Sequence, residues 1–555
     1  MTPLGGTARQ ADIVLRRDDW VGMELVSVED LLRQQAGVVV ARRGGLGSHV
    51  YLNVAGSVTG RIRVLVDGVD YTESEFQWPR VFSMLLVEID RIELHRSVEP
   101  ARLEIWTRKP DADAPVTEID LGRGEVGTRT RRVQLHTPTQ SWWVGFRYDE
   151  LLRGFHDFRT QRLTSAPADL GTYNGRGRAV DVGFQRPTGE RLLYRFEDYL
   201  DTAHGSFESV NDFSTSSRVL NALRWQRGVR GLDLTLDVSH QGWNRERRIN
   251  AIPQTISEVR GRAALDLELP HGNLQRTALY MRVNDVEGER FQDDMVQRAD
   301  YARYDVELFT RRGSDLFWNA GVGWHRDERF GNSWSAQAQL LSRRDAWEFD
   351  VEAGRGVTFR GWGEEESSAG TRPGTYAAAG VRHAGPSLEL GCRGYYKDLQ
   401  KQSSAAQLFF PTLGLGPRRI GAALVDVILA PKYEHLSWAL EGRLAWTPWT
   451  AGDRGGMADL HAELTGRFMR WDLFQGDLEV TLQTIWRLET RRVFTDTVSL
   501  PAVATGDVMI DVRLLQRLLL FWRVINVTDT RWEIHPGVLM PQRWSLFGVR
   551  ATLIN

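Results

Sequence analysis

The sequence alternates between apolar and polar residues over most of its length, and this alternation limits its fold more than any other feature. From residue 115 onward, one segment after another places an apolar side chain at every second position. Successive side chains of a β-strand point to opposite faces, so each segment would have one apolar and one polar face. The clearest apolar faces are Leu316, Trp318, Ala320, Val322 and Trp324; Trp347, Phe349, Val351 and Ala353; and Trp438, Leu440, Leu444 and Trp446. Aromatic residues recur near the ends of these faces, as they do at the two interfaces of a membrane barrel.

The connections between these segments fall into two classes that follow each other in turn. Short ones lie at 138–140, 187–190, 270–273, 343–345 and 385–387, and long ones at 151–174, 202–212, 244–255, 288–298, 358–372, 397–419 and 528–540. Short turns on one side and long loops on the other are typical of an outer-membrane barrel, whereas a soluble sandwich has no reason to separate them. The segments between Val116 and Ile554 number about 22, and barrels of that size carry a plugged lumen.

Composition excludes several other classes of protein. The chain has 70 basic and 72 acidic residues, and this balance argues against a nucleic-acid-binding protein, which needs a basic surface. The longest apolar runs, such as Leu518 to Trp522, fall well short of the ~20 residues that a membrane-spanning helix requires. A membrane role therefore requires a barrel or a surface contact. The first residues show no basic stretch followed by an apolar core, so we expect a processed or misassigned start rather than a visible signal peptide.

The N-terminal part of the chain is patterned differently and predicts a small α/β unit. Ser27 can cap a short helix, with Asp30 at the reciprocal position, and Gly37 stands where a helix C-terminus favours a left-handed residue. Asp67-Gly68 is a tight turn between two apolar strand pieces. Further strands are expected at 88–95 and 103–109. We expect a flexible segment at 1–19, this unit at 20–112 and a transmembrane β-barrel of about 22 antiparallel strands at 113–555.

The order of these pieces resembles the plug domain of the TonB-dependent outer-membrane receptors of Gram-negative bacteria. The residues that carry the resemblance are Ala36-Gly37-Val38, the strand and turn that contain Val66, Asp67 and Gly68, the strand with Arg91 and Glu93, and the strand that ends at Thr107. The resemblance implies a plug held inside the barrel lumen by polar contacts with the wall. Arg61, Arg63, Arg91 and Glu93 are the plug residues expected to make them.

The same resemblance implies a TonB box near the N-terminus, an extended segment that adds as a strand to the energy-transducing partner TonB. Asp12, Ile13, Val14 and Leu15 form a short extended apolar run at that place. The alternative is an ordinary tail or the first strand of the plug.

The C-terminal segment also resembles this family. Residues 543–553 alternate up to Leu553, as in the targeting strand through which barrel proteins engage the barrel-assembly machinery, although the family strand usually ends on Phe. Membrane lipid, TonB and an unidentified extracellular ligand are the other expected partners.

The sequence offers little that would support catalysis. We find no nucleophile elbow, zinc-protease motif or phosphate-binding loop, the histidines are scattered, and Cys392 is the sole cysteine. We therefore expect no enzyme, no cofactor and no metal site. Glu348, Asp350 and Glu352 could form an acid/base set, but a solvated lumen wall opposite plug arginines is the better interpretation. The apolar run with Leu408, Phe409, Phe410 and Leu413 is a candidate contact in an outer loop, for a hydrophobic ligand or a protein; packing of the loop on itself is the alternative.

Two functions stay open. The resemblance implies uptake of a scarce ligand, such as a siderophore, another metal chelate or a cobalamin-like molecule. Two departures from the family favour a plugged barrel that acts as a structural or interaction platform without transport. The arginine that usually follows the second plug strand is absent from Val54-Ala55-Gly56, and the link before the last plug strand is short.

Overall fold

The computed structural model describes two parts of the chain. In the N-terminal part these are residues 13–16, 20, 27–33, 35, 37–42, 50–55, 57–58, 62–70, 84, 89–96, 98 and 100–107. In the second part they are residues 115–554 without 125–128, 140, 155–171, 187–188, 205–212, 230–231, 250–251, 272–274, 293–294, 313–314, 360–370, 400–417, 432–435, 452–456, 474–477, 496–497, 516, 536–537 and 540–542.

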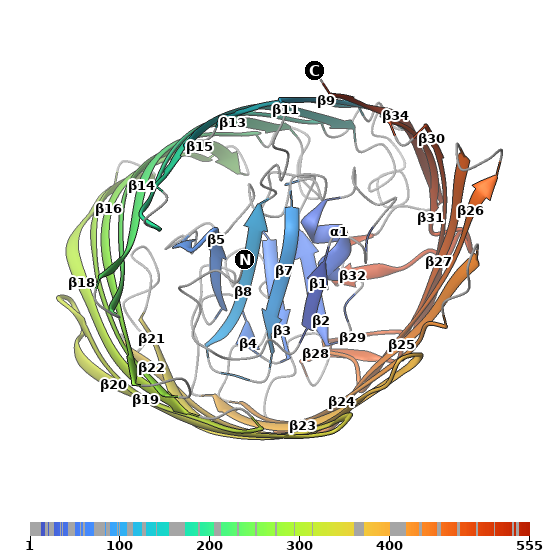
Figure 1. The fold of residues 1–555 in the computed structure, drawn as a ribbon. Helices are drawn as coiled ribbons and strands as arrows, with labels where there is room; N and C mark the ends of the chain where they lie inside the picture. The colour runs from blue at the N-terminus through green and yellow to red at the C-terminus, as the bar shows by residue number, and fades with distance from the viewer. Residues whose placement is uncertain are drawn as a thin grey trace.

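The second part forms a closed antiparallel barrel of 22 strands that surrounds the N-terminal part (Figure 1). Strand β34 closes the barrel by pairing with β9, from Leu546 opposite Gly124 to Ile554 opposite Val116. The wall strands are β9 (Val116–Gly124), β10 (Arg129–Pro138), β11 (Trp142–Gly154), β12 (Thr172–Gln185), β13 (Arg191–His204), β14 (Phe213–Val229), β15 (Leu232–Ile249), β16 (Ile252–His271), β17 (Gln275–Gln292), β18 (Met295–Arg312), β19 (Leu316–Asp327), β20 (Gly331–Arg344), β21 (Trp347–Phe359), β22 (Thr371–Ala384), β23 (Leu388–Leu399), β24 (Arg418–Leu429), β25 (Leu436–Ala451), β26 (Leu460–Leu473), β27 (Leu478–Glu489), β30 (Val503–Leu514), β31 (Leu518–Ile525) and β34 (Trp544–Ile554). Two small hairpins, β28 (Arg492–Thr495) with β29 (Val498–Leu500) and β32 (Glu533–His535) with β33 (Val538–Leu539), lie between wall strands. The predicted fold class is confirmed.

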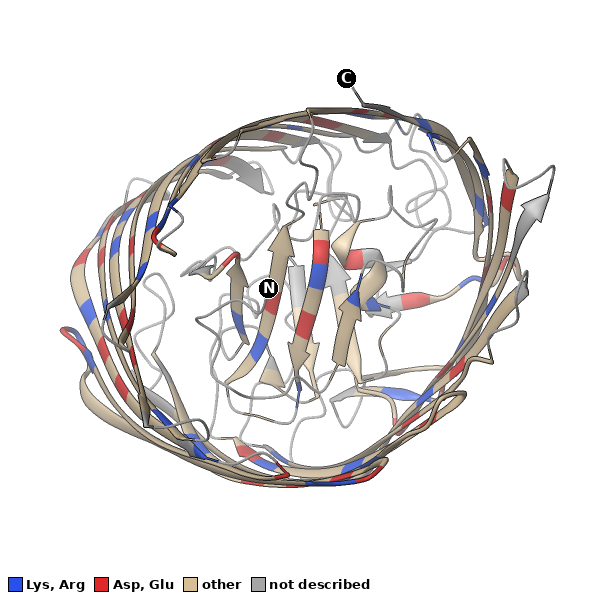
Figure 2. Ribbon diagram, viewed as in Figure 1, with Lys and Arg blue, Asp and Glu red and all other residues tan. Residues whose placement is uncertain are grey.

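The two faces of the wall are those that the alternation predicts. Val322, Val351 and Trp446 are each more than half exposed on the outside, whereas Glu352, Asp507 and Arg523 are buried on the lumen side. Charged residues recur along the wall strands and on the plug strands (Figure 2). Closure pairs the backbone groups of neighbouring wall strands, as a bilayer requires.

Two connections that were predicted to be long are instead tight hairpins. β15 and β16 stay paired up to Ile249 opposite Ile252, and β17 and β18 up to Gln292 opposite Met295. The loops predicted at 244–255 and 288–298 were therefore wrong, because these polar stretches continue as strand. The wall strands differ widely in length as a result: β16 has 20 residues and β31 has 8.

The plug contains two small sheets and a short helix. Its larger sheet has the order β1-β7-β8-β5-β6 and its smaller sheet the order β2-β3-β4. Its elements are β1 (Ile13–Arg16), α1 (Val28–Arg33), β2 (Val38–Arg42), β3 (Val50–Val54), β4 (Ser57–Val58), β5 (Ile62–Val66), β6 (Val69–Asp70), β7 (Ile89–His95) and β8 (Ala101–Thr107). One face of the larger sheet packs with the fully buried Trp20 and with α1 into a single apolar core. The segment boundaries at 19/20 and 112/113 remain proposals. No helix among the described residues is long and apolar enough to cross a membrane.

Charge on the outer face should cost far more than a change of apolar shape there. Val322→Arg would place a cation on a side chain that is 54% exposed and turned toward lipid. We expect it to destabilise the barrel by about 2–4 kcal/mol if the residue lies near the bilayer midplane, and Val322→Leu to change little. Reversible unfolding from lipid bilayers measures both, and equal effects would contradict the assignment of the faces.

Gly323, the lumen-facing neighbour of Val322, is not a suitable control position for Val322→Arg. A Cβ on Gly323 would lie 2.5 Å from Ser335 Oγ and 2.9 Å from His325 Nε2. Its close neighbours are thus wall side chains, so a larger residue here would collide with the wall itself.

Candidate functional site

The Asp67-Gly68 turn is a point of close contact between the plug and the barrel wall. Asp67 and Gly68 have φ angles of 51° and 81°, in the left-handed region that Asp tolerates and Gly favours. The carboxylate of Asp67 accepts hydrogen bonds from the backbone N–H of Thr107 at 2.9 Å and from its hydroxyl at 2.5 Å. The turn is thereby fastened to the end of β8.

Three wall arginines surround this turn. Arg195 of β13 forms an ion pair with Asp67 and donates to Thr107 Oγ1 at 3.2 Å, while its Nε pairs with Asp181 at 2.7 Å. Arg262 of β16 donates to the carbonyl oxygen of Gly68 at 3.2 Å. Arg224 of β14 lies so close that a Cβ on Gly68 would be 2.5 Å from its Nη2. The buried carboxylate thus has a guanidinium partner, which burial of a charge requires.

Two further polar contacts join other parts of the plug to the wall. Gln35, just after α1, accepts a hydrogen bond from Arg443 Nη1 at 2.9 Å, and Arg443 also pairs with Glu441 and Glu463 at 3.0 and 3.4 Å. Lys397, fully buried on β23, donates to Ser57 Oγ at 2.7 Å.

Apolar residues of the wall also pack against the plug. Leu220, Ile485 and Met509 join the apolar core of the plug. Ala55 packs in a separate cluster with wall residues of β22–β25 that include Tyr395 and Leu424. The plug is therefore held by polar contacts and by packing on several sides of the lumen.

The predicted plug-motif residues separate into two groups. Asp67, Gly68 and Thr107 come together at the wall, and Val66 lies in the plug core. Arg91 and Glu93 pair with each other at 3.1 Å on β7, and Arg91 also lies over the ring of Trp106, so their described contacts stay inside the plug. Arg61 lies outside the described residues.

The predicted TonB box forms the edge strand of the plug sheet. β1 pairs antiparallel with β7, with Ile13 opposite Leu94, Val14 opposite Glu93 and Leu15 opposite Ile92. Ile13 and Leu15 are buried, whereas Val14 is 38% exposed. This is the first-plug-strand arrangement that the sequence left open, and a role as TonB box stays a prediction. Asp12 and the outer-loop residues Leu408, Phe409, Phe410 and Leu413 lie outside the described residues.

The carboxylates on β21 do not form an acid/base set. Arg393 of β23 pairs with Asp350 at 2.5 Å and with Glu352 at 3.0 Å. Glu348 pairs with Arg343 at 2.8 Å. They belong to the polar wall, as expected, but their described arginine partners come from the wall and not from the plug.

A compact charged cluster lies within the plug on β7 and β8. Glu93, His95 and Glu104 place ligand-type atoms within 4.8 Å of one another, a spacing that could hold a metal ion. Arg91 pairs with Glu93, Arg102 pairs with Glu104, and His95 Nε2 lies 3.5 Å from Glu104. The two arginines already balance the two carboxylates, so a divalent ion would have to bind beside two cations. We therefore interpret the cluster as an ion-pair network.

Glu104 should make the stability of the plug depend on pH. Burial raises the pKa of its carboxyl, but the interactions with Arg102 and His95 outweigh this effect. The net result is that the pKa falls from its usual value of 4.5 to about 2. Because the folded-state pKa is depressed, the stabilisation is fully present above about pH 4.5 and is lost as the pH falls toward 2. A shift of this size corresponds to about 3 kcal/mol. We expect calorimetry of the plug transition to show this loss, and Glu104→Gln to flatten it; an unchanged pH profile in that variant would contradict the assignment.

The wall partners of the plug are the functional residues that the sequence did not reveal. Arg195, Arg224, Arg262, Arg443 and Lys397 stand on lumen faces that alternation identifies as polar. Nothing in their local sequence distinguishes them from the other charged residues of the wall.

Comparison with known proteins supports the fold alone. No family model and no curated protein matches the chain. Among solved structures it is similar to the siderophore receptor PirA from Acinetobacter baumannii, with a TM-score of 0.79, 10% identity and 98% of each chain covered. It is also similar to the FrpB iron transporter from Neisseria meningitidis, with a TM-score of 0.78, 8% identity, and 99% of this chain and 100% of that chain covered. For the ferric yersiniabactin uptake receptor FyuA from Yersinia pestis, the TM-score is 0.75, the identity 11%, and the coverage 99% and 98%. The chain thus has the plugged, 22-stranded barrel fold of the TonB-dependent outer-membrane receptors.

Proposed function

We propose that this protein imports a scarce ligand across the outer membrane in a TonB-dependent manner, and that the ligand is a ferric siderophore or a similar metal chelate. The observation that carries the proposal is a plug seated inside a 22-stranded lumen and anchored to its wall, because such a plug would have to move before a large ligand could pass. The solved structures with this architecture include siderophore receptors and an iron transporter, which favours a metal chelate over a cobalamin-like molecule.

The plug contacts are compatible with such movement. The polar contacts between the described parts of plug and wall are hydrogen bonds and ion pairs that can be exchanged for water, and the single cysteine of the chain cannot form a disulfide between the two parts. β1 lies at one edge of the plug sheet, where a pulling partner could reach it without crossing the other strands.

The experiment is an uptake assay with a panel of radiolabelled ferric siderophores. A strain that lacks this protein should lose accumulation of at least one of them, complementation should restore it, and deletion of TonB should abolish it again. Uptake that persists without TonB would refute the proposal.

The alternative function is a plugged barrel without transport, acting as a structural or interaction platform. The observation that favours it is the burial of Ile13 and Leu15 in the plug core, which would oppose withdrawal of β1 by a partner. It predicts that no chelate in the panel depends on this protein, although the protein reaches the outer membrane. Engagement of the barrel-assembly machinery by β34 is part of both proposals.

A further inference from the structure

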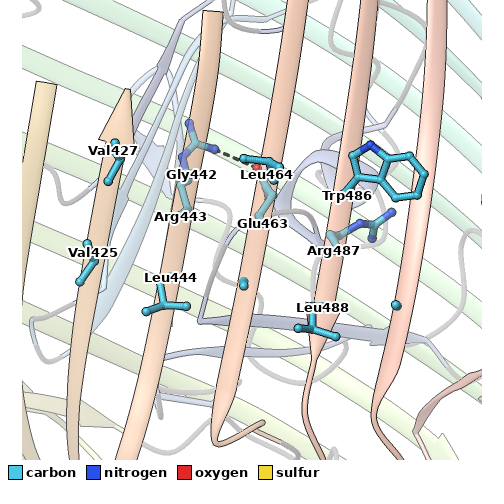
Figure 3. A pocket seen from close by; sticks show the side chains of 12 residues that line it. Val425, Val427, Gly442, Arg443, Leu444, Glu463, Leu464, Trp486, Arg487 and Leu488 are labelled. Carbon is cyan, nitrogen blue, oxygen red and sulfur yellow. Dashed lines mark hydrogen bonds and ion pairs between the residues drawn. The ribbon is translucent and has the colours of Figure 1, made fainter. Parts of the chain in front are cut away.

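Strand β18 extends beyond its neighbour β19 and leaves part of one sheet edge open. Its whole length, Met295–Arg312, pairs with β17, whereas its pairing with β19 ends where Arg303 lies opposite Asp327. Elsewhere in the wall a strand has a partner on each side, as β25 has around Arg443 (Figure 3). Among the described residues, Met295–Tyr301 has a strand partner on one side only, and we call this segment the free edge.

The backbone groups of the free edge point away from the sheet at every second residue. The N–H of Glu328 donates to the carbonyl oxygen of Ala302 at 3.1 Å, and the N–H of Ala302 donates to the carboxylate of Glu328 at 2.9 Å. The backbone of Ala302 therefore faces the β19 side. Because this direction alternates along a strand, the N–H and C=O groups of Val296, Arg298 and Asp300 face the same side. No described residue is their partner there, so Glu328 closes the edge at its base and leaves the rest open.

The free edge lies beyond the lipid. A strand crosses a bilayer in about 9–11 residues, and that length, counted from Arg312, ends near Ala302. Arg298 and Asp300, on the outer face of the free edge, are both exposed and charged. The longest connections, between β11 and β12 and between β23 and β24, lie at this end of the barrel, which is the extracellular end of an outer-membrane barrel. The free edge is therefore accessible from the medium.

The outer face beside the free edge carries unbalanced negative charge. Asp300 stands directly opposite Glu287 of β17, and both side chains are exposed. Neither forms an ion pair with a described residue, whereas Arg298 pairs with Glu289 at 3.0 Å. Like charges directly opposite each other on neighbouring strands are destabilising. A cation on the far side of Asp300, where a further strand would lie, would offset this repulsion.

We propose that the free edge binds an extended, basic segment of an extracellular protein, which adds to β18 as a further strand. Backbone hydrogen bonds with Val296, Arg298 and Asp300 would supply the affinity, and the side chains opposite them the specificity. The segment that fits best carries a basic residue opposite Asp300, an acidic one opposite Arg298 and an apolar one opposite Val296. Val296 is 45% exposed and stands beside Phe291, which is 51% exposed. The inference is independent of transport.

The barrel geometry disfavours a second copy of this protein as the occupant. Two copies in one membrane have the same orientation, and barrel strands tilt by about 35–45° from the barrel axis. The edges of copies related by a two-fold axis along the membrane normal would thus cross at about 70–90° instead of lying side by side. Within the edge itself, neither a proline nor a bulge in the β17–β18 register obstructs addition of a strand. Its charges select against an apolar strand but not against a complementary one.

The test measures binding of a fluorescein-labelled synthetic peptide, Thr-Lys-Thr-Glu-Thr-Val-Thr, to the full-length protein in detergent micelles by fluorescence anisotropy. The peptide has the proposed pattern for a strand that runs antiparallel to β18. One control peptide has Glu in place of Lys. The other has N-methyl groups on Lys, Glu and Val, which remove the N–H donors that would face β18 and keep every charge. We expect saturable binding of the first peptide and at least about fivefold weaker binding of each control.

Two substitutions in the free edge separate the backbone from the charge. Arg298→Pro removes an N–H that faces the open side and is not part of the β17 ladder, so the barrel should tolerate it. We expect it to bind the peptide about fivefold or more weakly than Arg298→Ala, which keeps the N–H. Asp300→Lys should reverse the preference, so that the peptide with Glu in place of Lys binds more tightly. Heat-modifiable migration on gels shows that each variant is folded.

Amide hydrogen exchange identifies what occupies the edge before the peptide is added. We expect the amides of Val296, Arg298 and Asp300 to exchange faster than that of Ala302 in the free protein, and to become protected when the peptide binds. Protection without the peptide would show that another segment of the chain or a second copy covers the edge, and would overturn the proposal. So would the absence of saturable binding, equal binding of the N-methylated peptide, equal binding by Arg298→Pro and Arg298→Ala, or an unchanged preference in Asp300→Lys.

Discussion

Uptake should stop when β1 is covalently tied to β7, and it should resume when the tie is reduced. The substitutions are Val14→Cys and Glu93→Cys in a Cys392→Ser background, since Cys392 is the sole cysteine and is exposed. Val14 and Glu93 are direct cross-strand partners, a separation that suits a disulfide, and the periplasm is oxidising. If TonB must draw β1 out of the sheet, the disulfide removes that freedom without touching the outer loops.

The measurement compares surface binding with accumulation of the chelate that the uptake panel identifies. We expect binding to persist and accumulation to fall to the level of a TonB deletion, with recovery after a mild reductant. Each single-cysteine variant controls for loss of the side chain, including loss of the Arg91–Glu93 ion pair. Normal accumulation with the disulfide formed would show that Ile13–Arg16 is not the coupling segment, and TonB would need another site of contact.

Removal of Arg195 should loosen the plug more than removal of any exposed wall arginine. Arg195→Ala would leave the carboxylate of Asp67 buried without its closest cation and would also remove the hydrogen bond to Thr107. Breaking a buried ion pair from one side costs about 3–5 kcal/mol. We expect a cost of this order in the calorimetric transition of the plug, and a rise in outer-membrane permeability to large antibiotics such as vancomycin.

Two further variants separate the charge from the geometry. Asp67→Asn keeps an acceptor for the Thr107 N–H and tolerates a φ of 51°, so adding it to Arg195→Ala should recover part of the loss by removing the stranded charge. Arg298→Ala is the matched control, because Arg298 and its partner Glu289 are both exposed; it should cost about 0–1 kcal/mol. Similar effects of Arg195→Ala and Arg298→Ala would refute the role of the Asp67 turn as an anchor.

The barrel could be predicted from sequence because the alternation of apolar and polar residues within each strand identifies its two faces. Leu316 to Trp324 alternate whatever the rest of the chain does, and the structure turns Val322 outward as expected. The alternation does not show where a strand ends and a loop begins. The stretch at 244–249 is mostly polar and therefore gives no apolar alternation, although it keeps its pairing with β16.

Of the contact between plug and wall at Asp67, only the plug residues could be predicted from the sequence. The Asp67-Gly68 turn and Thr107 follow from the order of motifs, but Arg195 and Arg262 stand 128 and 194 residues away from the groups they contact. Their position depends on how far each wall strand is shifted against its neighbour, which no local pattern encodes. At the Asp67 turn the carboxylate is on the plug and the cations are on the wall, the reverse of the expected arrangement. The expected plug arginine Arg63, however, interacts electrostatically with the wall carboxylate Asp305 of β18.

Because the strands differ in length, the barrel wall extends further on one side of the barrel than on the other. A strand needs only about 9–11 residues to cross a bilayer, whereas β15, β16, β17 and β18 have 18, 20, 18 and 18 residues. At about 3.3 Å per residue, the surplus extends these strands by roughly 25 Å along their own direction. The opposite arc, with β27, β30 and β31 at 12, 12 and 8 residues, has little or no surplus. A molecule that approaches from the medium therefore meets tall strands on one flank. On the other flank the hairpins β28–β29 and β32–β33 lie on the lumen side of the short strands, and β32 contacts the plug strand β2, so an approach over the short strands leads first to these hairpins.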